Sequence, residues 1–115
     1  MWLMTTVGFF SVVEKPWDRD AGTLTVRSRV RADLDTLRSK YLPELGEIQE
    51  DPQADYRYRA QVPRDAFSQA AARLAADIDY DNFKNEIARQ QGKARASLYG
   101  EVWTVLNRLQ SGKAG

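Results

Sequence analysis

The chain has 115 residues, and 17 Lys and Arg against 16 Asp and Glu give a formal net charge of +1. This length fits one compact domain, and the balanced charge favours neither an acidic nor a basic partner. The chain has no cysteine and no histidine. This excludes disulfides, thiolate nucleophiles, zinc-finger and iron–sulfur ligation and Ser-His-Asp triads. We therefore expect no cofactor and do not favour an enzyme.

The first segment, residues 2–13, is rich in aromatic and β-branched residues. It predicts one buried strand with a bulge or kink at Gly8. A secretory signal is disfavoured because no Lys or Arg precedes the segment and polar residues interrupt it. No stretch approaches the roughly twenty apolar residues that span a bilayer, so we expect a cytoplasmic protein without membrane contact.

The second strand is predicted over residues 22–31, where apolar and polar residues alternate strictly. A short helix should follow from Asp33 to Tyr41, with Asp33 as its cap. A hairpin is then predicted from a brief strand near Ile48 and a longer one over residues 56–62. The apolar faces of the two long strands should form the core, with these residues: Leu24, Val26, Val30, Tyr56, Tyr58 and Val62.

The rest of the chain predicts helices. Pro63 suits the first turn of a helix, and Phe67, Ala71, Leu74 and Ile78 recur at helical spacing. Asp79 or Asp81 should cap a short helix that Gly92 interrupts, and a last helix should run over about residues 94–109. We therefore expect one α+β domain over residues 1–110 and a flexible C-terminal tail over residues 111–115.

This order of elements predicts an α+β fold with a four-stranded antiparallel or mixed sheet. A ferredoxin-like sandwich is βαββαβ, and moving its last strand to the front gives a circularly permuted ββαββα order with additional C-terminal helices. The predicted sheet order is first, second, fourth, third, with the two middle strands parallel and the helices on one face. The extra helices extend the helical layer or reach a second subunit, so we expect a homodimer.

Arginines gather on one face of the two long predicted strands. Burying several unpaired charges is costly, so we expect this face to be open and to form one basic patch. Guanidinium groups suit phosphates and carboxylates, which makes these residues candidates for anion binding: Arg27, Arg29, Arg31, Arg57 and Arg59. Pairing with acidic residues such as Asp55 or Glu101, within the subunit or across a dimer, is the stronger alternative. The tyrosines are predicted to point inward, which disfavours an RNA-binding sheet.

The sequence contains a pattern that is similar to the start of a calcium loop, formed by Asp77, Asp79 and Asp81. Asn82 stands where that loop needs glycine. Helix capping by these residues is therefore favoured, and no metal site is assigned. Tyr99 and Trp103 lie on the last predicted helix and are candidate interface residues, because large aromatic side chains are enriched in protein interfaces.

The chain resembles a group of short bacterial proteins of unknown function. The segments that carry the resemblance cover most of the chain: MWLMTTVGFFSVV, LTVRSRVRADLDTLRSKYLP, DYRYR, IDYDNFKNEIARQQG and the helix from Tyr99 to Trp103. The resemblance implies a cytoplasmic bacterial protein and brings no activity, cofactor or site.

The sequence therefore favours a small non-enzymatic binding or regulatory module that acts through its open sheet face or its last helix. One alternative is a protein that binds nucleic acid or another phosphate ligand through the arginines. The other is a phosphate-handling hydrolase, by analogy of fold with acylphosphatase, although the Gly-rich loop ending in arginine is missing.

Overall fold

The computed structural model describes residues 1–112. Contacts divide the chain into two compact units, Met1–Ile78 and the part from Asp79 onward, and we describe each by itself. Of the expected tail, Ser111 ends a short helix, and residues 113–115 lie outside the described residues.

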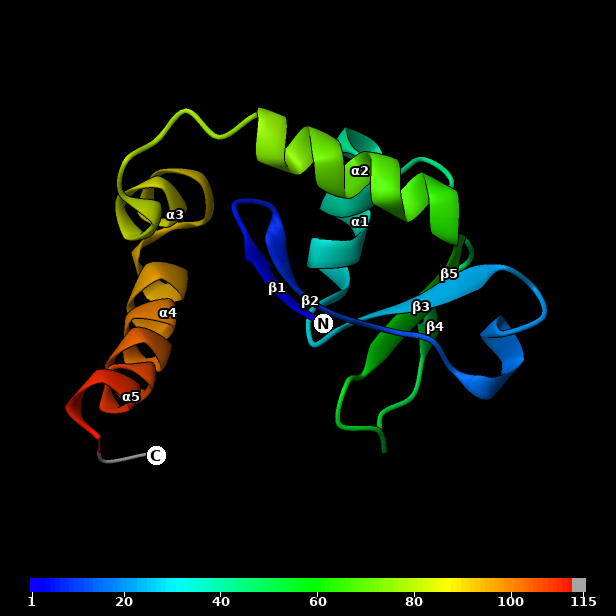
Figure 1. Cartoon of the computed structure of the whole chain (residues 1–115), viewed down its shortest axis with the longest axis horizontal. Coiled ribbons are helices and arrows are strands. Elements are labelled where there is room, and N and C mark those ends of the chain that lie inside the picture. Colours follow the sequence, from blue (N-terminus) through cyan, green and yellow to red (C-terminus); the bar gives the residue numbers. More distant parts are fainter. Residues whose placement is uncertain (113–115) are drawn as a thin grey trace. The chain divides into compact units, whose positions relative to one another are not determined.

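The first unit contains a sheet with the order β1-β2-β3-β5-β4 (Figure 1). Its strands are β1 (Trp2–Thr5), β2 (Gly8–Val13), β3 (Thr23–Ser28), β4 (Gln49–Glu50) and β5 (Tyr58–Pro63). The α+β class is confirmed, and so is the predicted strand order. The count of four strands is wrong, because residues 2–13 form a hairpin of two strands instead of one kinked strand.

The side chain of Thr5 explains the tight reversal in this hairpin. Its Oγ1 accepts hydrogen bonds from the backbone N–H groups of Val7 (3.1 Å) and Gly8 (3.2 Å) and donates one to the Gly8 carbonyl (2.9 Å). Gly8 has φ of 151°, a conformation that residues with a Cβ rarely adopt. The chain therefore turns back at the position where the sequence predicts only a kink.

All strand pairs are antiparallel, which corrects the prediction of parallel middle strands. The crossover through α1 (Arg31–Lys40) joins β3 to β4, and these two strands are not neighbours. The β4–β5 hairpin then reverses the chain once more. Strand β5 therefore enters the sheet beside β3 in the opposite direction.

Helices α1 and α2 (Arg64–Ala76) contact the same face of the sheet (Figure 1). Leu34 and Leu37 of α1 are fully enclosed, as their helical spacing predicts. The core between the layers contains Val7, Phe10, Val12, Val26, Leu34, Leu37, Leu42, Leu45, Ile48, Ala60, Val62, Phe67 and Ala70. We call the opposite side of the sheet the open face.

Three boundary predictions are wrong. Val30 is 41% exposed because it precedes α1 as its N-cap residue instead of continuing β3. Asp33 lies inside the first turn, and its Oδ2 accepts a hydrogen bond from the Phe9 backbone N–H at 3.1 Å, which ties the helix to β2. Ile78 is exposed because α2 ends two residues earlier, at Ala76.

The second unit contains α3 (Phe83–Gln91), α4 (Lys93–Leu106) and α5 (Arg108–Ser111). Asn82, not Asp79 or Asp81, caps α3, because its side chain accepts from the Asn85 backbone N–H. The rings of Phe83 and Tyr99 stack with centroids 6.2 Å apart, which joins α3 to α4. Among residues 1–112, no helix is long and apolar enough to cross a membrane.

Candidate anion-binding site on the open sheet face

A row of side chains crosses the sheet in register. Paired residues on neighbouring strands project to the same side. The row, in order from β1 to β4, is Trp2, Ser11, Arg27, Arg59 and Gln49. Val26 precedes Arg27 in β3 and Ala60 follows Arg59 in β5, and both side chains belong to the core. Because side chains alternate along a strand, the row lies on the open face.

Arg27 and Arg59, which we call the arginine pair, face each other directly across β3 and β5. Arg27 Nη2 donates to the Ser11 hydroxyl at 2.7 Å, and Arg59 Nη2 donates to the Tyr56 carbonyl at 2.9 Å. The Nε atoms of both arginines are enclosed without a hydrogen-bond acceptor in the described structure. A buried donor without an acceptor costs about 1–3 kcal/mol, and like charges directly opposite also destabilise a sheet.

Arg29 joins this pair through the ring of Tyr56. The guanidinium carbons of Arg27 and Arg29 lie 4.7 Å and 4.4 Å from the ring centroid, and Arg29 Nη1 also donates to the Asp55 carbonyl at 2.7 Å. Tyr56 is only 4% exposed. Tyr56 is therefore buried, as predicted, but its ring packs against the arginines and lies outside the core cluster between the layers.

No ion pair within residues 1–112 includes Arg27, Arg29 or Arg59. The acceptors of all three are neutral oxygens: the Ser11 hydroxyl and two backbone carbonyls. The Asp55 carboxylate accepts from the Tyr56 backbone N–H and forms no ion pair within residues 1–112, and its pairing with the arginines across a dimer stays a prediction. Within residues 1–112, these three positive charges thus have no ion-pair partner.

The other two predicted arginines lie elsewhere. Arg31 is the first residue of α1, where it pairs with Asp35 at 3.8 Å, so it is not part of the sheet face. Arg57 precedes β5, and its Nε donates to Glu50 Oε2 at 2.6 Å. That hydrogen bond raises the pKa of Arg57 above its ordinary value. The patch of five arginines reduces to a cluster of three.

A buried carboxylate organises the turn beside β3. Asp18 lies in the short 3-10 helix η1 (Pro16–Asp18) and is 1% exposed. Its oxygens accept from the Thr23 hydroxyl (2.6 Å), the Thr25 hydroxyl (2.8 Å), the Lys15 backbone N–H (2.8 Å) and Gln61 Nε2 (3.1 Å). Burial raises the pKa of Asp18, but these hydrogen bonds together outweigh it and hold the pKa below its ordinary value.

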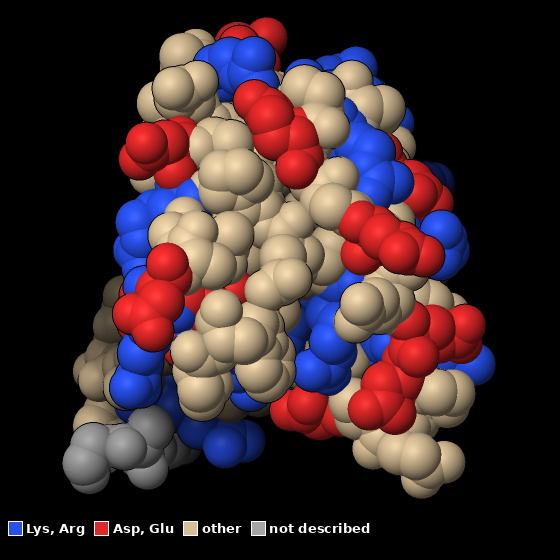
Figure 2. Space-filling model, turned by 90° about the vertical axis from the view of Figure 1, so that its right-hand side faces the viewer, with Lys and Arg blue, Asp and Glu red and all other residues tan. Residues whose placement is uncertain are grey.

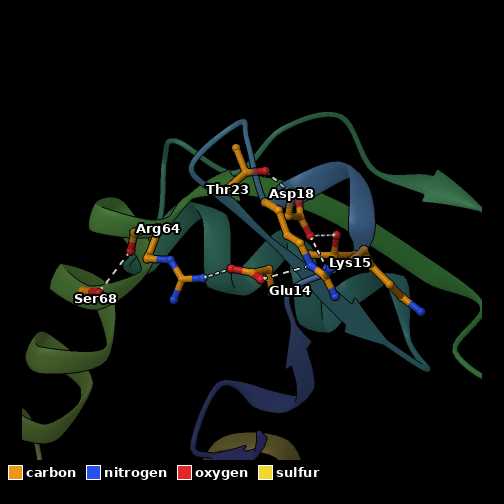
Figure 3. Close-up of polar contacts among 8 residues, drawn as sticks. Glu14, Lys15, Asp18, Thr23, Arg64 and Ser68 are labelled. Atoms are coloured by element: carbon orange, nitrogen blue, oxygen red, sulfur yellow. Dashed lines mark hydrogen bonds and ion pairs between the residues drawn. The ribbon is translucent and has the colours of Figure 1, made fainter.

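Figure 3 shows Asp18 between Thr23 and Lys15, and beside it a second polar cluster at Glu14. Glu14 pairs with Arg64 Nη2 at 2.5 Å and with Arg19 Nε at 3.6 Å. On the face that Figure 2 shows, acidic and basic side chains are interspersed. Opposite charges are thus mixed on this face, whereas Arg27, Arg29 and Arg59 have no ion pair within residues 1–112.

The Asp18 network fixes an exposed indole ring. Trp17 Nε1 donates to the Thr25 hydroxyl at 3.2 Å, and this hydroxyl in turn donates to Asp18. Trp17 nevertheless remains 55% exposed. A pocket of about 310 Å³ lies beside it, lined by Trp17, Thr25, Gly46, Glu47, Gln49, Arg59, Ala60 and Gln61. This volume is at the lower end of small-molecule sites.

The remaining candidates lie outside this cluster. Tyr99 is 8% exposed and stacks on Phe83, whereas Trp103 of the same helix is 68% exposed. Asp77 of the calcium-like pattern accepts from the Tyr41 hydroxyl at 2.5 Å. Within residues 1–112, no group of three or more carboxylates is placed to hold a metal ion.

Sequence reasoning missed Ser11, Trp17 and Asp18, which complete the site. Alternation identified Arg27 and Arg59, but the partners of these arginines come from other segments. The one local signal was the tryptophan inside the turn-forming segment EKPWDRDAG, because an aromatic side chain in a polar turn needs a partner.

Comparisons with protein-family models, with curated proteins and with solved structures found no match. The resemblance to short bacterial proteins therefore stays a prediction, and the function is argued from the site alone.

Proposed function

We propose that this chain is a binding protein without catalytic activity, and that it binds an anionic ligand through the arginine pair. The observation that carries the proposal is the cluster itself: Arg27, Arg29 and Arg59 gather on the open face without a carboxylate partner in the described structure. A phosphate or carboxylate supplies the negative charge that these guanidinium groups lack.

The cluster is also held in position before a ligand arrives. Ser11 and the Tyr56 carbonyl each fix one nitrogen of the arginine pair, and the Tyr56 ring packs against Arg27 and Arg29. Ordering a long arginine side chain costs conformational entropy, so side chains that are already ordered bind more tightly. This arrangement supports binding at the sheet face more than a freely solvated charge would.

The test is retention on heparin as salt rises, for wild type and for Arg27→Gln and Arg59→Gln. Each substitution removes a charged contact, and we expect each to weaken binding about ten-fold and to lower the salt concentration at elution. Arg57→Gln is the matched control, because Arg57 lies close in sequence but is already paired with Glu50. Retention that is insensitive to salt, or unchanged when both arginines are replaced, would overturn the proposal.

For the fold, we propose that strands β2 to β5 form the circularly permuted ferredoxin-like arrangement. Three observations support this interpretation: the order β2-β3-β5-β4, the helices α1 and α2 after β3 and β5, and both helices on one face. Strand β1 is then an addition at the edge of the sheet.

A second candidate function is self-association through α4, which would make the chain a homodimer. Leu98, Val102 and Val105 recur at spacings of four and three, and Leu98 and Val105 are 56% and 50% exposed. This spacing is that of a seam between paired helices, and an uncharged seam is complementary to a second copy of itself.

For this dimer, we expect Leu98→Glu to halve the mass measured by light scattering after size exclusion. Ser97→Glu is the control, because Ser97 is exposed on the same helix but outside the seam. A monomeric wild type, or a dimer that Leu98→Glu leaves intact, would exclude this seam as the interface.

A further inference from the structure

Two exposed tryptophans lie on the same face of the sheet as the arginine pair. Trp2 is 72% exposed at the end of the cross-sheet row, and Phe9 packs against it edge to face with centroids 5.7 Å apart. Trp17 is 55% exposed and is hydrogen-bonded to Thr25, which shares the face of Arg27. The sequence disfavoured an RNA-binding sheet because its tyrosines were predicted to point inward, but the exposed rings on this face are indoles.

The two indoles flank the arginine pair. Trp2 is two strands away from Arg27 in the row, which corresponds to about 10 Å at the usual strand spacing. Thr25, which holds Trp17, is two residues from Arg27 along β3, or about 7 Å. Both rings therefore lie close enough to the arginine pair for one extended ligand to contact the rings and the guanidinium groups together.

Each ring also has a contact that favours one orientation. The Trp17 indole N–H is bound to Thr25, which the buried Asp18 holds in turn, and the Trp2 ring rests against Phe9. A fixed and exposed aromatic face loses little entropy when a flat ring stacks on it. The pocket next to Trp17 adds the side-chain amides of Gln49 and Gln61, groups that can bond to the edge of a base.

We infer that the anionic ligand is single-stranded nucleic acid, and this inference rests on the proposed function. Its phosphates bind Arg27 and Arg59, and its bases stack on Trp2 and Trp17. Stacking platforms beside a track of positive charge are the chemistry that recognises single strands, because every base offers a flat face and a single strand leaves it free. A duplex hides its base faces, and an acidic peptide or a sulfated sugar has none to offer.

The test measures binding of a labelled oligothymidylate of about four nucleotides, near the smallest site of single-strand binders. We expect Trp2→Leu and Trp17→Leu each to weaken this binding about ten-fold. Trp17→Phe keeps a stacking ring but loses the hydrogen bond to Thr25, so its affinity should lie between those of wild type and Trp17→Leu. Trp103→Leu, which removes an exposed indole from α4, is the control and should bind as wild type does.

The same variants are titrated with inorganic pyrophosphate, which has charge but no base. We expect Trp2→Leu and Trp17→Leu to bind pyrophosphate as wild type does, which also shows that they are folded. Oligothymidylate binding that these variants leave unchanged, or equally tight binding of a hairpin duplex with a stem long enough to be stable, would overturn the inference and leave anion binding standing. If the wild-type protein binds none of the three ligands, pyrophosphate, heparin and oligothymidylate, the proposed function itself is overturned.

Discussion

Gly8→Ala is expected to lower the free energy of unfolding by about 3 kcal/mol. Two costs add at this position. Gly8 has φ of 151°, and a Cβ built on it would lie 2.6 Å from Cγ of Asp33. The Asp33 carboxylate would have to move, and its hydrogen bond from the Phe9 N–H would then be lost. Because this bond ties α1 to β2, the damage should reach beyond the hairpin.

Urea unfolding followed by circular dichroism measures this loss, and Gly22→Ala is the control. Gly22 also has a positive φ, of 68°, but a Cβ there would meet nothing within 4 Å. It therefore isolates the backbone cost, which is about 1 kcal/mol for alanine. Equal losses for the two variants would show that the contact with Asp33 is unimportant.

The Gly8 reversal illustrates why part of the fold could not be predicted from the sequence. Residues 2–13 contain none of the paired turn formers that mark a hairpin, and Thr6 and Val7 at the turn are typical strand residues. What bends the chain is a set of hydrogen bonds to Thr5 and the space that Asp33 leaves only for glycine. The second of these comes from a residue far along the chain.

The arginine cluster was predictable in part, and the limit has a physical cause. Alternation places Arg27 and Arg59 correctly because both lie inside strands. Arg31 and Tyr56 were misplaced because alternation holds only while the chain is extended: α1 begins at Arg31, and β5 begins two residues after Tyr56. Errors of one or two residues at strand ends thus decide which side chains reach the face.

The partners of these side chains come from distant segments, so no local pattern contains them. Ser11 reaches Arg27 from β2, and Gln61 reaches Asp18 from β5. The sequence could identify which residue types needed partners. The sheet order and register determine which partners they obtain.

Asp18→Asn is expected to lower the free energy of unfolding by about 2–3 kcal/mol at pH 7. Four donors converge on the carboxylate, and the backbone N–H of Lys15 among them cannot turn away or become an acceptor. An amide carries no charge and presents a donor on one side, so all four hydrogen bonds lose their charge and the Thr23 hydroxyl and the Gln61 amide must turn to accept from it. Asp20→Asn, in the exposed part of the same turn, is the control and should change stability little.

The effect should depend on pH in one direction. The folded-state pKa of Asp18 lies below its ordinary value, so the ionised carboxylate is the stabilising form. Its contribution is complete above the unfolded pKa of about 3.9 and is lost as pH falls through the folded pKa. The stability difference between wild type and Asp18→Asn should therefore shrink below about pH 4. A difference that stays constant down to the acid transition would show that shape, not charge, explains the loss.

The same carboxylate also couples stability to the site. Asp18 holds Thr25, which orients Trp17, and it holds Gln61, which lines the pocket. Asp18→Asn should therefore weaken oligothymidylate binding at pH 7 even where the protein remains folded, while pyrophosphate binding at Arg27 and Arg59 persists. Loss of both ligands in a folded variant would mean that the turn positions the arginine pair as well, and would make the network part of the anion site.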